Sequence, residues 1–148
     1  MITLTATAFD PGALLSDFCH GRTETGAVAS FVGLARAEGG TAMALELEAY
    51  PGFTEARISQ HVAAAKTRFA LQDVLIVHRI GPIAPGEPIV FVATAAPHRR
   101  AAFEACDFLM DYLKSRAPFW KKETGPDGAR WIAPRPQDLT DLARWETS

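Results

Sequence analysis

Alternating apolar and polar side chains predict several β-strands in this chain. In residues 41–50, Met43, Leu45, Leu47 and Ala49 alternate with polar or exposed positions, which is typical of a half-exposed strand. Other short runs rich in Thr, Val and Ile predict strands at 2–9, 26–34, 73–80 and 88–96. The segments FWKKE (119–123) and ARWIA (129–133) flank TGPDG, a pattern that favours a β-hairpin.

Apolar residues at helical spacing predict helices at 11–20, 54–69 and 98–117, with a short helix or turn over 136–145. The 98–117 helix is expected to end before Pro118, because proline restricts the residue before it. Its predicted buried side chains are Phe103, Cys106, Leu109, Met110 and Leu113, and its predicted solvated acids are Glu104 and Asp111.

The order of these elements predicts the fold class. Strands and helices mix without regular βαβ alternation, which favours an α+β fold: a mostly antiparallel or mixed sheet packed with helices, plus a C-terminal β-hairpin. A chain of 148 residues without internal repeats or linkers is expected to form a single domain, residues 1–148.

Composition indicates a soluble globular protein, with 48% hydrophobic and 22% charged residues. The sequence has no membrane-length apolar run and no basic, apolar leader, so we expect a cytoplasmic protein with no membrane association. Cys19 and Cys106 are 87 positions apart and belong to no CxxC motif. We therefore predict two reduced thiols, no metal site and no cofactor.

Cations are concentrated in residues 97–123, PHRRAAFEACDFLMDYLKSRAPFWKKE. This segment holds six of the 15 lysines and arginines of a chain whose formal net charge is -2. A nucleic-acid-binding protein would be basic more generally. The pattern favours a small anionic ligand and no nucleic acid.

Three places in this segment are candidates for binding or catalysis. His98 and Arg99 open the predicted helix, where free backbone N–H groups favour an anion. Lys114 is in the last turn, where the helix dipole alone would favour a lysine. Lys121 follows Phe119 and Trp120, an aromatic setting that partly desolvates an ammonium, and such a lysine can act as a general acid or base.

Other candidates leave a structural alternative open. Arg36 ends an apolar strand, where an arginine is equally common in an anion site and on a plain surface. Cys106 is the only plausible nucleophile by residue type, but its place on the apolar helix face favours a buried structural thiol. His78 is inside a predicted strand, where a core histidine is more common than a catalyst.

Several motifs together resemble the large, catalytic subunit family of molybdopterin synthase. They cover most of the chain, in the family's order: GAVASFVGLAR (26–36), LELEAYPGF (45–53), VHRIGPIAPGE (77–87), residues 97–123 and GARWI (128–132). The combination of AFEAC, DYLKxxAPFWKKE and RW is specific. The loop AEGGTAMA after Arg36 is shorter than is usual in the family, and the first 25 residues carry no distinctive motif.

The resemblance implies an α/β hammerhead fold, a homodimer, and a heterotetramer with a small ubiquitin-like sulfur carrier. The carrier's C-terminal Gly-Gly thiocarboxylate would enter a pocket of this chain. The implied reaction is a sulfur transfer that converts cyclic pyranopterin monophosphate to molybdopterin, a dithiolene, in molybdenum cofactor biosynthesis.

The resemblance also implies roles for individual residues. The implied catalytic residues are Lys114 and Lys121, which would transfer protons and stabilise charge on the transferring acyl group. The implied substrate-binding residues are these two lysines together with Arg36, His98, Arg99, Lys122, Glu123 and, less directly, Arg135.

Two other functions remain open at this point. One alternative is a non-catalytic binding module for a ubiquitin-like carrier tail, although the presence of both Lys114 and Lys121 favours an enzyme. It is alternatively an acyltransferase or hydrolase that uses Cys106 with His98 or His78.

The length of the predicted helix raises a geometric problem for the implied site. His98 and Lys114 are 16 positions apart, which corresponds to roughly 24 Å along a continuous helix. A pterin monophosphate is much smaller than this distance. We therefore expect a site shared by two protomers, with His98 and Arg99 of one completing the pocket of the other.

Overall fold

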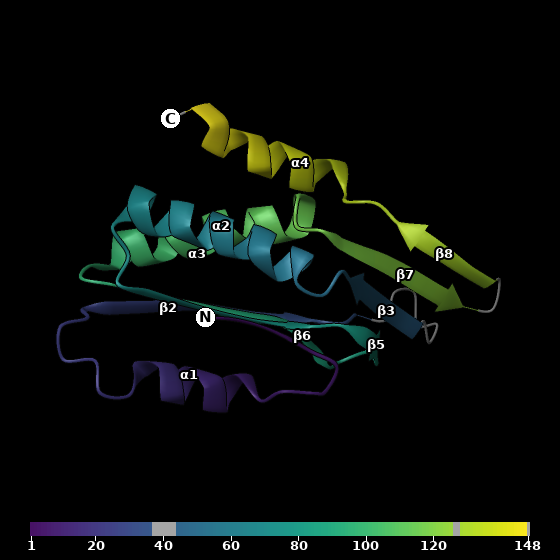
Figure 1. Ribbon diagram of the computed structural model, residues 1–148, viewed down its shortest axis with the longest axis horizontal. Helices are drawn as coiled ribbons and strands as arrows, with labels where there is room; N and C mark the ends of the chain where they lie inside the picture. The colour runs from purple at the N-terminus through teal and green to yellow at the C-terminus, as the bar shows by residue number, and fades with distance from the viewer. Residues whose placement is uncertain (37–43, 126–127, 148) are drawn as a thin grey trace.

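The computed structural model describes residues 1–36, 44–125 and 128–147 (Figure 1). The strands are β1 (Ile2–Thr5), β2 (Ala27–Leu34), β3 (Ala44–Ala49), β4 (Asp73–Arg79), β5 (Gly81–Ile83), β6 (Pro88–Ala96), β7 (Phe119–Gly125) and β8 (Gly128–Ile132). The helices are α1 (Pro11–Cys19), α2 (Phe53–Phe69), α3 (Arg99–Ser115) and α4 (Pro136–Ala143), followed by a 3-10 turn, Arg144–Thr147.

The larger sheet forms the centre of the molecule, with strand order β1-β4-β6-β2. Only the β1–β4 pair is parallel; β4 and β2 both run antiparallel to β6. Figure 1 shows α1 on one face of this sheet and α2 and α3 on the other, with α4 outside α2 and α3. Because helices cover both faces, β6 is buried along most of its length and reads as a nearly continuous apolar run.

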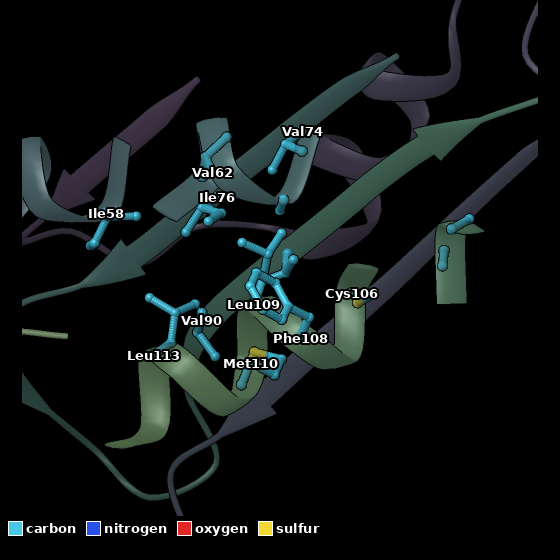
Figure 2. Packing of buried hydrophobic residues seen from close by; sticks show 14 of the residues in the cluster. Ile58, Val62, Val74, Ile76, Val90, Cys106, Phe108, Leu109, Met110 and Leu113 are labelled. Atoms are coloured by element: carbon cyan, nitrogen blue, oxygen red, sulfur yellow. The ribbon is translucent and has the colours of Figure 1, made fainter. Parts of the chain in front are cut away.

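The main core is between this sheet and the helix pair α2–α3. Figure 2 shows side chains of α2 and α3 directed toward those of β4 and β6, among them Ile58, Ile76, Val90 and Leu109. On the opposite face, Phe18 of α1 packs in a second cluster that contains Phe91. No helix in the described ranges is long and apolar enough to cross a membrane.

The second sheet is fully antiparallel, with strand order β5-β3-β7-β8. The predicted β-hairpin is confirmed as β7 and β8. The predicted alternation is confirmed for Leu45 and Leu47, which are both buried in a small cluster with Ala35 and Ile83. Met43 and the predicted loop 37–40 lie outside the described residues.

The α+β prediction is confirmed, with differences in two strands. The first strand ends at Thr5 rather than at residue 9, because the chain bends there and Thr7 N–H donates to Thr5 Oγ1 at 3.2 Å. The connection between β4 and β6 contains β5, which sequence analysis missed. A three-residue strand is too short for its alternation to be recognised.

The prediction that Phe103 is buried is wrong, since 65% of its surface is exposed. At 100° per residue, the buried stripe of α3 centres on Ala102, Cys106, Leu109 and Leu113, and Phe103 lies at its margin. Phe108 is buried, although it lies further from the centre of this stripe than Phe103 does. It packs against Trp145 of the C-terminal segment, a partner that the spacing within α3 does not reveal.

The interpretation of Asp111 as a solvated acid is also wrong, whereas Glu104 lies on the exposed face beside Arg100. Asp111 is only 13% exposed. Its carboxylate accepts hydrogen bonds from Arg144, at 2.8 Å, and from Trp145 Nε1, at 2.6 Å. These bonds attach the C-terminal segment to α3, and the donors follow more than 30 positions later in the sequence.

We predict that Asp111→Ala lowers the free energy of unfolding by about 2 kcal/mol, because it removes a largely buried acceptor shared by two donors and leaves Trp145 Nε1 without its partner. Asp107→Ala is the matched control: Asp107 also binds Arg144, but it is 53% exposed. The control should cost less than about 1 kcal/mol. Urea unfolding of both variants measures the difference, and equal losses would contradict the structural role of Asp111.

Candidate functional site

A pocket of about 400 Å³ opens where the C-terminal end of α3, one face of the smaller sheet and the start of α4 meet. Its walls are largely apolar and include Leu45, Leu47, Met110, Phe119 and Ile132. Its charged side chains are Lys114, Lys121, Arg135 and Asp138. The pocket therefore combines apolar walls with three cations, an arrangement suited to a ligand with a flat apolar body and an anionic group.

Strand alternation places Lys121 in this pocket. Lys121 pairs with Leu47 of β3 and with Ile132 of β8, and residues paired across strands share one face of the sheet. Since Leu47 and Ile132 both line the pocket, Lys121 is on the pocket face between them.

The same alternation directs Lys122 to the opposite face. There it lies over the ring of Trp131, with Nζ 5.7 Å from the ring centroid. Glu123 returns to the face of Lys121 two residues further along β7. Neither Lys122 nor Glu123 lines the pocket in the described part of the chain.

Lys114 enters the pocket from the last turn of α3. Although the residue as a whole is exposed, burial of the ammonium lowers its pKa, and the neighbouring charges of Lys121 and Arg135 lower it further. Asp138 opposes this effect, but the net result is a pKa below the ordinary value for lysine. A lysine with a lowered pKa can exchange protons more readily near neutral pH.

His78 also lines the pocket, from β4, and is 6% exposed. Its ring stacks on Phe119, with centroids 4.0 Å apart, and Nδ1–H donates to the Arg79 carbonyl at 2.9 Å. Burial lowers the pKa of His78 to about 4, so the ring is neutral and Nε2 is left as an acceptor. His78 is thus a core histidine, as the sequence favours, and at the same time part of the pocket wall.

Arg36 is exposed and follows the end of β2, two residues after the pocket-lining Leu34. The preceding Ala35 is fixed by backbone hydrogen bonds, as its N–H donates to the Glu87 carbonyl at 2.9 Å. Arg36 is therefore near the pocket in sequence, but it is not among the described residues that line it.

His98 and Arg99 are at the opposite end of α3. They line a separate surface hollow together with Arg100, Phe103 and Glu104. Gly26 fixes this end of the helix close to β2, because a Cβ at position 26 would lie 2.0 Å from the Pro97 carbonyl oxygen. The hollow is a shallow, cationic site that adjoins an exposed aromatic ring.

The structure confirms that Arg99 and Lys114 are on one uninterrupted helix, with His98 as its N-cap. α3 is continuous from Arg99 to Ser115, so roughly 24 Å separates its two ends. Within one chain, the structure brings together Lys114, Lys121 and Arg135 but not His98 and Arg99.

Cys106 is buried on the face of α3 that packs into the core. Burial, with a smaller contribution from Asp107, raises the pKa of its thiol to about 12. A protonated, enclosed thiol is a poor nucleophile. This setting confirms the structural interpretation of Cys106 and argues against a cysteine-dependent reaction.

Residues 4–116 match the sequence model of the family described as MoaE protein. The matched range includes most of the N-terminal segment that lacks a distinctive motif. The molybdopterin synthase catalytic subunit of Caulobacter vibrioides is 70% identical over 99% of this chain and 97% of its own length. This chain therefore belongs to the MoaE protein family.

Solved structures agree with this assignment. The molybdopterin biosynthesis MoaE protein of Burkholderia ambifaria superposes with a TM-score of 0.84 at 46% identity, covering 100% of this chain and 99% of its own. The molybdopterin synthase of Staphylococcus aureus gives a TM-score of 0.80 at 28% identity, over 88% of this chain and 96% of its own.

We predict that a thiol reagent modifies Cys19, which is exposed, and leaves Cys106 unmodified in the folded protein. Mass spectrometry of the native protein should find a single modified site, and a second should appear after denaturation. Rapid modification of Cys106 in the native state would contradict the buried setting described above.

Proposed function

We propose that this protein is the catalytic subunit of molybdopterin synthase, a sulfurtransferase of molybdenum cofactor biosynthesis that converts cyclic pyranopterin monophosphate to molybdopterin. The observation that carries the proposal is the convergence of Lys114 and Lys121 in one apolar-walled pocket. The family assignment supports it, since curated relatives with this name are up to 70% identical.

The chemistry of the pocket suits this substrate. A pterin is a flat ring system that can pack between the apolar walls, and its phosphate requires cations. The sulfur comes from the thiocarboxylate of a carrier protein, which is itself the nucleophile. The reaction therefore needs no cysteine of this chain, in agreement with the enclosed, protonated thiol of Cys106.

The two lysines have complementary tasks in this proposal. Charge develops on the carrier's acyl group as sulfur is transferred, and a fixed ammonium nearby stabilises it. Protons must also move as bonds to sulfur form. Lys114, with its lowered pKa, suits proton transfer, and Lys121, held between Leu47 and Ile132, suits charge stabilisation.

The partner in this proposal is a small ubiquitin-like subunit. The name of the relatives, catalytic subunit, implies an enzyme with at least one further subunit. A tail that ends in Gly-Gly has no side chains near its terminus, so it can enter a pocket of about 400 Å³ that also receives a pterin. Arg36, beside the pocket-lining end of β2, is proposed to contact substrate or tail.

The complete site is proposed to lie between two protomers of a homodimer. The cationic hollow at His98 and Arg99 is too far from Lys114 to contact the same pterin within one chain. A two-fold axis can place the start of one α3 beside the end of its partner's. His98 and Arg99 of one protomer would then bind the phosphate of a substrate held by the other protomer's lysines.

A non-catalytic binding module for a carrier tail remains the alternative. Such a module would need the apolar walls of the pocket but not a lysine with a lowered pKa. The setting of Lys114 therefore favours the enzyme.

We predict that Lys121→Ala lowers product formation at least about a hundredfold while costing at most about 0.5 kcal/mol of stability. The assay combines purified protein, cyclic pyranopterin monophosphate and thiocarboxylated carrier, and measures the dithiolene product. Lys66→Ala, an exposed lysine of α2, is the control and should retain turnover. Near-normal turnover in Lys121→Ala would remove this residue from the catalytic site, and no product with the unmodified protein would refute the proposed function.

A further inference from the structure

Asp138 is the one acidic side chain among the described residues that line the pocket of Lys114 and Lys121. It is in the first turn of α4 and is only 13% exposed. Neither the motifs of the sequence nor the proposed reaction assigns it a task. A carboxylate in a pocket meant for an anion works against binding, so its presence requires a reason.

Hydrogen bonds fix this carboxylate in place. Asp138 Oδ1 accepts from Arg135 Nη2 at 3.1 Å, and Oδ2 accepts from the Arg135 backbone N–H at 3.2 Å. The same turn is attached to α3, because Ser115 Oγ donates to the Asp138 carbonyl at 3.0 Å. Ser115 directly follows Lys114, so these contacts hold Asp138 beside the end of α3 that carries Lys114.

The charges that face Lys114 come from several elements. Lys121 of β7 and Arg135 at the start of α4 disfavour its protonated form, and Asp138 favours it. His78 of β4 is neutral. Burial tends to raise the pKa of Asp138, but the bonds from Arg135 and the charge of Lys114 outweigh burial and keep that pKa below its ordinary value. Asp138 is therefore ionised at neutral pH and is the counter-charge of a crowded group of cations.

We propose that Asp138 is a positioning residue of the catalytic pocket, whose carboxylate holds Arg135 in the pocket wall and keeps Lys114 protonated in the absence of substrate. A lysine with a desolvated ammonium near two other cations would otherwise lose its proton too easily. With Asp138 in place, Lys114 is an ammonium that can donate a proton or stabilise an anion when the substrate arrives. The catalytic role of the Lys114 ammonium rests on the proposed function, whereas the effect of Asp138 on the protonation of Lys114 does not.

Competitive labelling with acetic anhydride tests the charge directly. Only the unprotonated amine reacts, so the labelling rate of each lysine against pH, measured by mass spectrometry, reports its protonation in the intact protein. Lys66 on the surface of α2 is the internal reference.

Two variants are expected to change the labelling rate of Lys114 in opposite directions. Asp138→Asn keeps an acceptor for the Arg135 backbone N–H but removes a negative charge near Lys114. At pH values below the titration midpoint of Lys114, this lysine should therefore label roughly threefold faster than in the unmodified protein. In Arg135→Gln a neighbouring positive charge is lost, and Lys114 should label more slowly than in the unmodified protein. Asp141→Asn is the matched control, since Asp141 is on the same helix and bonds to Gln137. It should leave Lys114 unchanged.

Unchanged labelling of Lys114 in folded Asp138→Asn would overturn the proposal, as would an equal change in Asp141→Asn. If Asp138→Asn does not fold, Asp138→Ser decides: faster labelling of Lys114 supports the proposal, and unchanged or slower labelling overturns it. Turnover against pH separates this proposal from the proposed function. If labelling of Lys114 shifts while the pH profile of turnover does not, the proposal for Asp138 stands and the role of Lys114 in proton transfer is wrong.

Discussion

The packing of α3 against the larger sheet is the constraint on which the rest of this structure depends. One stripe of the helix, through Ala102, Cys106, Leu109 and Leu113, is buried against β2 and β6, and Gly26 lets the chain before the helix approach closely. This packing makes α3 a rigid spacer with a cationic group at each end. The helix supports two half-sites that cannot meet within one chain, and the proposed dimer follows from that separation.

The smaller sheet and α4 complete one of these half-sites. Register in β7 decides which lysine enters the pocket, since a slip of one residue would exchange Lys121 for Lys122. Two contacts attach the C-terminal segment to α3: the Asp111 carboxylate accepts from Arg144 and Trp145, and the Asp138 backbone carbonyl accepts from Ser115 Oγ. The side of the pocket formed by the start of α4 depends on these contacts. The C-terminal end of α3 therefore contributes both to the stability of the fold and to the proposed catalytic pocket.

Much of this arrangement could be predicted from the sequence, because local periodicity determines it. The alternation of β3 and β7 and the length of α3 follow from patterns within one segment, and they place Lys114 and Lys121 correctly relative to their own elements. The predictions failed where a partner comes from a distant part of the chain. Asp111 accepts hydrogen bonds from Arg144 and Trp145, and Asp138 interacts electrostatically with Lys114. These partners are far apart in the sequence, and the periodicity within one segment cannot predict such contacts. Phe103 was misjudged because spacing cannot fix the margin of a buried stripe.

The central claim is that each catalytic pocket is completed by the start of α3 from a second protomer. Mixing Arg99→Ala protein with Lys121→Ala protein, after subunit exchange has been verified, tests this claim most directly. Each variant alone has no intact site, whereas a mixed dimer places both substitutions in one pocket and leaves the other pocket complete. The account predicts partial recovery of product formation in the mixture; the absence of any recovery despite verified exchange would contradict it.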